Sequence, residues 1–318
     1  MRFVMNYYFA PMEGLTDSIY RKAHHAHFSG VTRYYMPFIS PTVHRTLTPR
    51  EARELPTADS VPFEAVPQLL TKVAEDFLWA AGVCRDLGYR EVNLNLGCPS
   101  GTVTAKGKGS GMLRDLDQLR LFLDGIYADA PLPISVKTRL GYDDPEEFPA
   151  ILEILNNYPI HELTVHPRVR KDFYNGSVNM DAFRYCLEHS NAPVCYNGNL
   201  CSISQIEAFQ NEFPQVNSLM IGRGLVGDPG MLTPGGTTAD ALEAFMDTLL
   251  EEYQIAFGSA RNAMFRLKEN WHLLLYRFDG SEKLGKRLRK TTDLAEYKQI
   301  VHEIFHTLPM SSALRADW

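Results

Sequence analysis

Side chains able to bind a ligand or transfer a proton follow a series of short apolar runs in this sequence. In the segment NLNLGCPSGTVTAKGKGSGML, an apolar run ends near Asn95, and Cys98 follows between a glycine and a proline. Each such residue alone has an ordinary explanation, such as a strand-end cap or a surface lysine. Their recurrence after so many runs favours one shared site. The corresponding positions after other runs are Pro11–Gly14, Gln68, Lys137, Arg139, His166, Asn197–Asn199 and Gly222–Gly224.

The apolar runs alternate with helix-like segments such as KVAEDFLWAAGVCRDLG and DLDQLRLFLDGIYADA. This alternation predicts a parallel sheet, and eight such units in about 235 residues match a (β/α)₈ barrel. Functional residues of such barrels gather just after the carboxyl ends of the strands, where the residues above fall. We expect strands near Tyr8–Ala10, Arg33–Met36, Ala65–Gln68, Glu91–Leu94, Ile134–Val136, Glu162–Val165, Pro193–Tyr196 and Ser218–Ile221.

The pattern changes after the segment TPGGTTAD at 233–240, and from there it is purely helical. We therefore predict a barrel domain at 1–235 and a domain of three or four helices at 241–318. The helical part is electrically neutral, with 11 Lys/Arg and 11 Asp/Glu, yet its segment KLGKRLRK holds five basic residues in eight. That run is typical of a solvated helix face, or of a local patch that contacts phosphates.

The bulk properties are those of a water-soluble protein of 318 residues with a net charge of −6. The negative net charge argues against a protein whose whole surface binds nucleic acid. Five cysteines without a CxxC pair predict neither a disulfide framework nor a structural zinc site, and we expect no metal. Because no apolar stretch reaches 18 residues and no secretory signal is present, we expect a cytoplasmic protein without a membrane segment.

The segment IGRGLVGDP matches the G-x-G-x-x-G pattern of dinucleotide-binding folds. A Rossmann fold needs a further strand and an acidic residue about 20 positions later, whereas TPGGTTAD and helices follow here. The last loop of a barrel explains the glycines better, because they let backbone N–H groups approach a phosphate while Arg223 supplies charge. Asn197 and Gly198 would complete that phosphate site.

A phosphate site at the last two strands and polar groups at the others suggest flavin mononucleotide (FMN) lying across the barrel mouth. Gln68 offers both a donor and an acceptor to the pyrimidine edge of the flavin ring. Lys137 is suited to stabilise the negative charge that reduction places there.

Taken together, these segments resemble the tRNA-dihydrouridine synthase family, flavoenzymes that reduce particular uridines of tRNA. The most specific match is N-L-G-C-P followed by a glycine-rich loop. The matching segments follow the family's order over the whole barrel, and the helical tail has the expected size. They are APMEGLTDSIYR, VPQLL, NLNLGCPSGTVTAKGKGSGMLRD, VKTRLGYDD, LTVHPRVRKDFYNG, VCYNGNL and LMIGRGLVGDP.

The resemblance implies a role for each matching residue. Cys98 would be the catalytic acid, Asn95 and Arg139 would face the target uracil, and the helical tail would grip the tRNA. The electron donor would be NADPH, and we expect a monomer. The residues that would hold the flavin are Pro11, Met12, Glu13, Gln68, Lys137, His166, Asn197, Gly198, Asn199, Gly222 and Arg223. The basic and aromatic residues that would contact RNA are Lys106, Lys286, Arg287, Arg289 and Lys290, together with Lys268 and Trp271.

Three positions depart from the usual family pattern. Asn93 stands where the family often has an acidic residue, Pro167 makes HPR of the usual HGR, and Asn199 makes NGN of NGD or NGE. Pro167 removes a backbone donor beside His166, and Asn199 removes a carboxylate near the proposed phosphate site. Neither of these two changes touches the thiol, the lysine or the phosphate loop, so we expect them to bear on substrate choice more than on the activity itself.

Reduction of the uracil C5–C6 double bond needs a hydride at C6 and a proton at C5. A cysteine thiol has an ordinary pKa of about 8.5, so Cys98 is protonated at neutral pH and suited to supply that proton. We predict a flexible loop after Cys98, with hinges at Gly107, Gly109 and Gly111, that orders over an extruded base.

Two alternatives remain open. One is a barrel flavoenzyme of the dihydroorotate dehydrogenase type, which acts on a free dihydropyrimidine and has no use for a basic helical tail. The other is a non-catalytic tRNA-binding protein that keeps the barrel as a scaffold. Retention of Cys98, Lys137 and the phosphate loop together argues against the second.

Overall fold

The computed structural model describes residues 5–311. Residues 1–4 and 312–318, which begin and end the two predicted domains, lie outside the described residues. Nine parallel strands form one sheet in the order β3-β2-β1-β9-β8-β7-β6-β5-β4. The strands are β1 (Asn6–Phe9), β2 (Arg33–Tyr35), β3 (Ala65–Val66), β4 (Gln68–Leu69), β5 (Val92–Leu96), β6 (Ile134–Gly141), β7 (Leu163–Val169), β8 (Val194–Tyr196) and β9 (Ser218–Ile221).

The two end strands of this order, β3 and β4, are separated in the chain only by Pro67. Proline has no N–H to donate to a ladder, so it divides the third predicted strand into two short pieces. The sheet is thereby a nearly closed barrel of eight strand positions, as the sequence predicts. All eight strand predictions are confirmed, with shifts of only a few residues at the ends.

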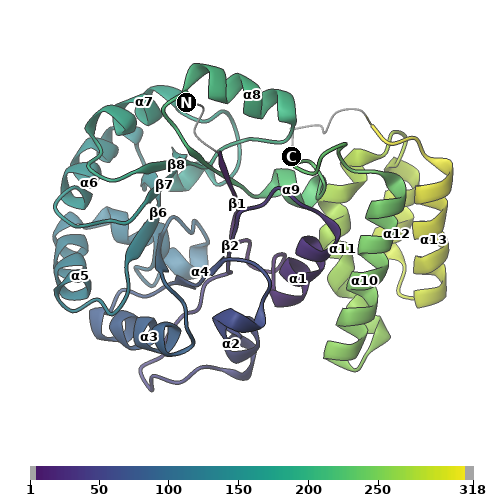
Figure 1. The fold of residues 1–318 in the computed structure, drawn as a ribbon, viewed down its shortest axis with the longest axis horizontal. Coiled ribbons are helices and arrows are strands. Elements are labelled where there is room, and N and C mark those ends of the chain that lie inside the picture. Colours follow the sequence, from purple (N-terminus) through teal and green to yellow (C-terminus); the bar gives the residue numbers. More distant parts are fainter. Residues whose placement is uncertain (1–4, 312–318) are drawn as a thin grey trace. The chain divides into compact units, whose positions relative to one another are not determined.

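Helices follow most strands (Figure 1). In the part of the chain around β6 and β7, the helices α5 and α6 lie outside the strands. The α-helices of the barrel region are α1 (Ser18–His27), α2 (Pro49–Glu54), α3 (Ala74–Asp86), α4 (Gly101–Thr104), α5 (Leu116–Ala128), α6 (Phe148–Leu155), α7 (Met180–His189), α8 (Ile203–Glu212) and α9 (Arg223–Gly227). Short 3₁₀ helices are η1 (Ala58–Ser60), η2 (Gly109–Arg114), η3 (Pro145–Glu147) and η4 (Arg170–Asp172).

The chain divides into two compact units. The first comprises the segments up to Pro11, 32–198 and 214–220, and so contains nearly all of the sheet. The second comprises 12–31, 199–213 and everything from Ile221 onward. Three barrel-region helices, α1, α8 and α9, therefore group with the tail. The predicted domain limits at 235 and 241 stay a prediction.

Within the second unit, the tail forms four helices that lie side by side: α10 (Ala239–Phe257), α11 (Ala260–Leu274), α12 (Glu282–Lys290) and α13 (Leu294–Thr307), with the 3₁₀ turn η5 (Leu275–Arg277) (Figure 1). Side-chain oxygens of Thr238, Ser259 and Asp293 cap the first turns of α10, α11 and α13. The apolar faces bury Leu249 and Trp271 among others. Among the described residues, no helix is both long and apolar enough to span a membrane.

Candidate active site at the carboxyl ends of the strands

A chain of buried amide side chains crosses the carboxyl ends of β4, β5 and β6. The Gln68 amide nitrogen Nε2 donates to Asn93 Oδ1 at 2.8 Å, and Asn93 Nδ2 donates to Ser135 Oγ at 2.9 Å. Asn95 Nδ2 donates to Gln68 Oε1 at 2.8 Å. The parallel register pairs Gln68 with Asn93 and Asn93 with Ser135, which places these side chains on one side of the sheet. An amide at position 93 thus serves as both acceptor and donor, which a carboxylate does not do.

Asn95 also positions the backbone at Cys98. Its Oδ1 accepts hydrogen bonds from the N–H of Gly97 at 3.1 Å and from the N–H of Cys98 at 2.9 Å. The Cys98 carbonyl oxygen in turn accepts from Ser110 Oγ at 2.8 Å. The thiol-bearing turn is therefore held from both sides by side chains of the protein itself.

Cys98 differs from the other four cysteines in its exposure. It is partly exposed, whereas Cys84, Cys186, Cys195 and Cys201 are buried. Burial raises the pKa of Cys84 and of Cys186 to about 12 and that of Cys201 to about 11, and it raises the pKa of Cys195 well above its ordinary value. Buried thiols of this kind are inert, which leaves Cys98 as the thiol suited to chemistry.

The segment after Cys98 is more ordered than the predicted flexible loop. It forms α4 and then η2, and residues 109–113 are buried. Gly109 has a φ of +57°, and a methyl carbon at this position would lie only 3.0 Å from the Cys98 Cβ. A methyl group on Gly111 would meet the Thr104 carbonyl oxygen at 2.7 Å. Gly109 allows close packing against the thiol turn and Gly111 against the end of α4, and the hinge role of the glycines stays a prediction.

Lys137 lies beside Asn95 in the register of β5 and β6. Burial, reinforced by the positive charge of Arg139, lowers its pKa to about 7, while Cys98 and Cys195 favour the charged form. Such a lysine loses its proton easily at neutral pH. Any negative charge placed beside its charged form would be strongly stabilised.

Arg139 is buried and bonded to three backbone carbonyl groups. Its Nε donates to Gly97 O at 2.9 Å, its Nη1 to Val169 O at 2.9 Å and its Nη2 to Phe173 O at 2.6 Å. The guanidinium also lies over the ring of Tyr174, 5.4 Å from its centroid. Arg139 thus ties the turn at Cys98 to the loop after β7. Its contact with uracil stays a prediction. The three bonds use three of the five N–H donors of the guanidinium, so two are left for such a contact.

His166 is buried next to Arg168, whose Nη1 lies 2.9 Å from the imidazole Nε2. A guanidinium only donates, so Nε2 accepts and the imidazole carries its proton on Nδ1. Arg168 is anchored by the carbonyl oxygens of Asn175 and Gly176. Pro167, which stands where the family usually has glycine, lies within β7. Its carbonyl oxygen accepts from the N–H of Asn179 at 2.8 Å.

Asn197 and Gly198 follow β8 in the first unit. Asn197 Nδ2 donates to the carbonyl oxygen of Met220 at 2.7 Å, which ties the end of β8 to β9. A methyl carbon on Gly198 would collide with the Tyr196 hydroxyl, so no other residue fits there without movement. Pro11, at the end of β1, is half-buried in the same unit.

The remaining predicted flavin residues belong to the second unit: Met12, Glu13, Asn199, Gly222 and Arg223. Arg223 Nη2 donates to Asn199 Oδ1 at 3.1 Å. In this bond the neutral amide of Asn199 accepts from the guanidinium, whereas the carboxylate usual in the family would bring a negative charge. A methyl carbon on Gly224 would collide with the Leu200 carbonyl oxygen, so this turn also requires glycine.

The turn that contains Met12 and Glu13 has a support that the sequence did not reveal. In the second unit, the tail residue Arg266 donates to the Gly14 carbonyl oxygen and, at 2.6 Å, to Asp17 Oδ2. The hydroxyl of Tyr253 donates to Asp17 Oδ1 at 2.8 Å. Asp17 also caps α1 through the N–H of Tyr20, so it links the first helix to the tail. The one signal in the sequence is an aspartate before a helix, which indicates a cap but does not indicate the distant tail residues.

Three lysines gather at the turn between α4 and η2. Lys106 is exposed. Burial is the main cause that lowers the pKa of Lys108, and the positive charges of Lys106 and Lys72 lower it further. Lys108 Nζ donates to Ser40 Oγ at 2.9 Å, which fixes its position. Lys72, Lys106 and Lys108 therefore form a cluster suited to a phosphate.

The basic run on α12 divides into two sets. Leu284, Gly285 and Leu288 are buried, and Arg287 forms an ion pair with Glu303 at 2.9 Å. The exposed basic residues are Lys283, Lys286, Arg289 and Lys290.

Two other tail residues of the predicted RNA surface have internal roles. Trp271 is 1% exposed and donates from Nε1 to the Tyr297 hydroxyl at 2.9 Å, so its predicted RNA contact is wrong. Lys268 Nζ donates to the carbonyl oxygens of Thr291 and Arg289, at the end of α12. Its ammonium therefore caps the last turn of that helix.

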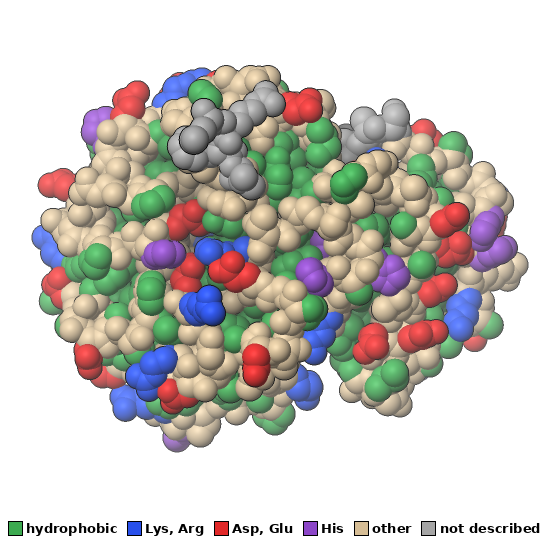
Figure 2. All heavy atoms as spheres, viewed as in Figure 1, with side chains coloured by type: hydrophobic (Ala, Val, Ile, Leu, Met, Phe, Trp, Pro, Cys, Tyr) green, Lys and Arg blue, Asp and Glu red, His purple; other side chains and the backbone are tan. Residues whose placement is uncertain are grey.

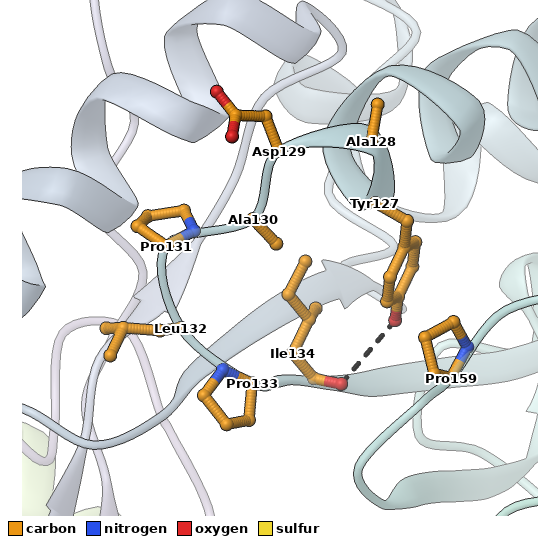
Figure 3. Close-up of a pocket in the computed structure, with 9 residues that line it drawn as sticks. All are labelled: Tyr127, Ala128, Asp129, Ala130, Pro131, Leu132, Pro133, Ile134 and Pro159. Atoms are coloured by element: carbon orange, nitrogen blue, oxygen red, sulfur yellow. Dashed lines mark hydrogen bonds between the residues drawn. The ribbon is translucent and has the colours of Figure 1, made fainter.

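A surface depression of about 460 Å³ lies at the opposite end of β6. Residues 127–134 and Pro159 line it, and the Tyr127 hydroxyl donates to Ile134 O at 3.5 Å (Figure 3). Asp129 is the one charged side chain in its lining. Proline and backbone groups dominate this depression, so it offers none of the chemistry found at the strand ends.

The barrel and its polar strand ends define a (β/α)₈-barrel enzyme. Comparison with solved structures agrees on the fold: morphinone reductase superposes with a TM-score of 0.50 at 10% identity, over 71% of this chain and 84% of that one. Morphinone reductase in complex with tetrahydroNAD gives a TM-score of 0.52 at 8% identity, over 71% and 85% of the two chains.

Sequence comparison supplies the family. The family model described as dihydrouridine synthase (Dus) matches residues 8–309. A probable tRNA-dihydrouridine synthase of Rickettsia prowazekii is 28% identical over 230 residues, 72% of this chain and 69% of the relative. The tRNA-dihydrouridine synthase B of Pasteurella multocida is 25% identical over 284 residues, 89% and 81% of the two chains. This chain belongs to the dihydrouridine synthase family, which makes it an oxidoreductase and confirms the predicted resemblance.

Proposed function

We propose that this protein reduces the C5–C6 double bond of particular uridines in tRNA, with FMN as its bound cofactor and NADPH as the electron donor. The relatives carry the name tRNA-dihydrouridine synthase, which supports tRNA as the substrate. The observation that carries the proposal is the placement of Cys98. Its thiol turn is held by Asn95 at the carboxyl end of β5, beside the lysine of β6.

The residues of the first unit fit a flavin ring by their chemistry. Gln68 has one N–H and one lone pair left after its bonds to Asn93 and Asn95, so it can still offer a donor and an acceptor. Lys137 stabilises negative charge, and Gly198 leaves backbone accessible where a side chain would not fit. FMN, when bound and reduced, supplies the hydride.

The protein's own part in the reaction is to bind, orient and protonate. Cys98 donates its thiol proton to uracil C5. Hydride addition would form the new C6–H bond, the π electrons of the C5–C6 double bond would form the C5–H bond with this proton, and Cys98 would be left as a thiolate that takes a proton from solvent. Arg139 and Asn95 keep the thiol turn in place through the Gly97 carbonyl and the Cys98 N–H. Because these bonds lie within the protein itself, the acid is preorganised and needs no reorganisation during the reaction.

The basic residues that face outward support binding of a polyanion. On the first unit the exposed ones are Lys72 and Lys106, with the half-buried Lys108 beside them, and on α12 they are Lys286, Arg289 and Lys290. Each neutralised phosphate adds affinity that falls with salt concentration. Arg223, which donates to the neutral Asn199, would supply positive charge to the FMN phosphate.

The test is the dihydrouridine content of an unmodified tRNA transcript after incubation with the enzyme, FMN and NADPH, measured by mass spectrometry of the nucleosides. Loss of a general acid typically costs about 10²- to 10⁴-fold in rate, so Cys98→Ala should lose that much turnover and still bind flavin. Ser100→Ala, two residues away at the start of α4, is the matched control and should stay near wild type. Full turnover by Cys98→Ala would contradict the proposal.

A further inference from the structure

Two histidines and a glutamate come together between two helices of the tail. His302 and His306 are one turn apart on α13, and Glu243 lies on α10. The imidazole nitrogens and one carboxylate oxygen all lie within 4.8 Å of one another. The rings of the two histidines are 4.1 Å apart between centroids, and His306 Nε2 lies 3.2 Å from Glu243 Oε1.

The packing of α13 fixes this arrangement. Ile300, Val301, Ile304 and Phe305 bury one face of the helix, and the two histidines lie outside that face. Both histidines are exposed, and Glu243 is partly buried. The cluster is therefore open to ions from solvent while its helices are held by an apolar core. In Figure 2, histidine side chains lie together over α13 with acidic side chains beside them.

The spacing suits a transition-metal ion. A tetrahedral zinc ion with ligands at about 2.0–2.1 Å holds neighbouring ligand atoms roughly 3.3–3.4 Å apart, close to the 3.2 Å between His306 and Glu243. The ligand atom of His302 lies within 4.8 Å of the other two, so binding an ion requires side-chain rotation that brings it closer. Two imidazoles and one carboxylate form a ligand set that zinc uses in proteins, with a fourth position left to water.

The surrounding charges also favour a cation. Asp247 lies one turn after Glu243 on α10, close enough for the negative charge of Glu243 to act on it. His306 is in the last turn of α13, where the partial negative charge of the helix end attracts cations. The positive charge of Lys298, a turn before His302, also acts on Asp247 and opposes this effect.

We propose that Glu243, His302 and His306 form a binding site for a divalent transition-metal ion, Zn²⁺ by its ligand set, that links α10 to α13. Such an ion joins the first and last helices of the tail, whose ligands are more than 50 residues apart in the chain. We expected no metal because the sequence has no CxxC pair. The three proposed ligands lie on two helices that the sequence alone does not place next to each other. The site is separate from the residues proposed to act on uridine.

The experiment is titration of the metal-free, full-length protein with Zn²⁺ by calorimetry, followed by Co²⁺ as a spectroscopic probe. We expect one Zn²⁺ per chain and a visible Co²⁺ absorption band of tetrahedral intensity. His302→Ala and His306→Ala should each weaken Zn²⁺ binding at least tenfold, and Glu243→Gln should weaken it less. The matched control is His272→Ala, an exposed histidine on α11 outside the cluster, which should bind as wild type does.

A second measurement does not depend on heat signals. Saturating Zn²⁺ should raise the unfolding temperature of the wild-type protein by a few degrees, because an ion that binds only the folded state stabilises it. The His302→Ala/His306→Ala double variant should unfold at the same temperature with and without the ion. Equal Zn²⁺ affinity in wild type and double variant, or an equal shift in unfolding temperature, would overturn the proposal.

Discussion

The side-chain oxygen Oδ1 of Asn95 accepts the backbone N–H of Cys98 at 2.9 Å, across one turn of chain that leaves the barrel. The same side chain donates to Gln68 at 2.8 Å. Asn95 therefore connects the barrel interior to the position of the thiol, and this link is the structural basis of the proposed proton transfer.

Asn95→Ala should lower turnover more than it lowers tRNA affinity. The substitution leaves the N–H groups of Gly97 and Cys98 and the Gln68 carbonyl without their partner, at a cost of roughly 1–3 kcal/mol in stability. Asn95→Asp keeps the acceptor for the thiol turn and loses only the donor to Gln68, so it should fall between Ala and wild type. Steady-state kinetics with tRNA separate kcat from KM. An Ala variant with wild-type kcat would contradict the positioning role.

Lys137 should make the flavin-free protein sensitive to pH. Its pKa is about 7 when folded and about 10.4 in an unfolded chain, so between these values the unfolded state binds more protons and stability rises with pH. Below pH 7 the lysine lowers the free energy of unfolding by its full amount, which is on the order of several kcal/mol. Lys137→Met should therefore be the more stable protein at pH 6, with a difference that shrinks towards pH 10.

Urea unfolding at pH 6, 8 and 10 measures this difference. Lys22→Met is the control, because Lys22 is an exposed lysine of α1 and should show little difference at any pH. A stability difference for Lys137→Met that stays constant from pH 6 to pH 10 would show that the lysine is not held in a depressed state.

The basic residues of α12 should separate into RNA contacts and structural contacts. Lys286→Ala and Arg289→Ala should each weaken tRNA binding and reduce the slope of log affinity against log salt by about one. Arg287→Ala should instead lose its pair with Glu303, a partly exposed ion pair whose removal costs at most about 1 kcal/mol. Filter binding at several salt concentrations makes the comparison. Equal salt slopes for all three variants and wild type would place the RNA elsewhere.

The positions of the strands were predictable because each buried strand of a parallel barrel is a short apolar run. The residues at the strand ends followed from the same pattern, and Gln68, Asn95 and Lys137 do lie in neighbouring registers. Their partners did not follow, because hydrogen bonds between strands depend on register, which one sequence does not specify. The link from Asn95 to Gln68 is such a case.

Other features could not be predicted from the sequence, for different physical reasons. The three carbonyl groups around Arg139 come from the turn after β5, the end of β7 and the loop that follows β7, whose convergence depends on the barrel. The alternating glycines after Cys98 suggested mobility, yet their lack of side chains permits close packing against Thr104. Trp271 lies among basic residues in the sequence, but the helical period places it on the buried face of α11.

The proposed function requires that tRNA accept electrons from this protein through a site that contains Cys98. The most direct test is to reduce the bound flavin with NADPH under anaerobic conditions, remove the excess, and add unmodified tRNA transcript while following the flavin absorbance. We predict rapid return of the oxidised spectrum with tRNA, no return with free uridine, and a much slower return in Cys98→Ala. Failure of tRNA to reoxidise the flavin, with reoxidation by fumarate or a quinone instead, would contradict the proposed function and indicate a dehydrogenase of free dihydropyrimidines.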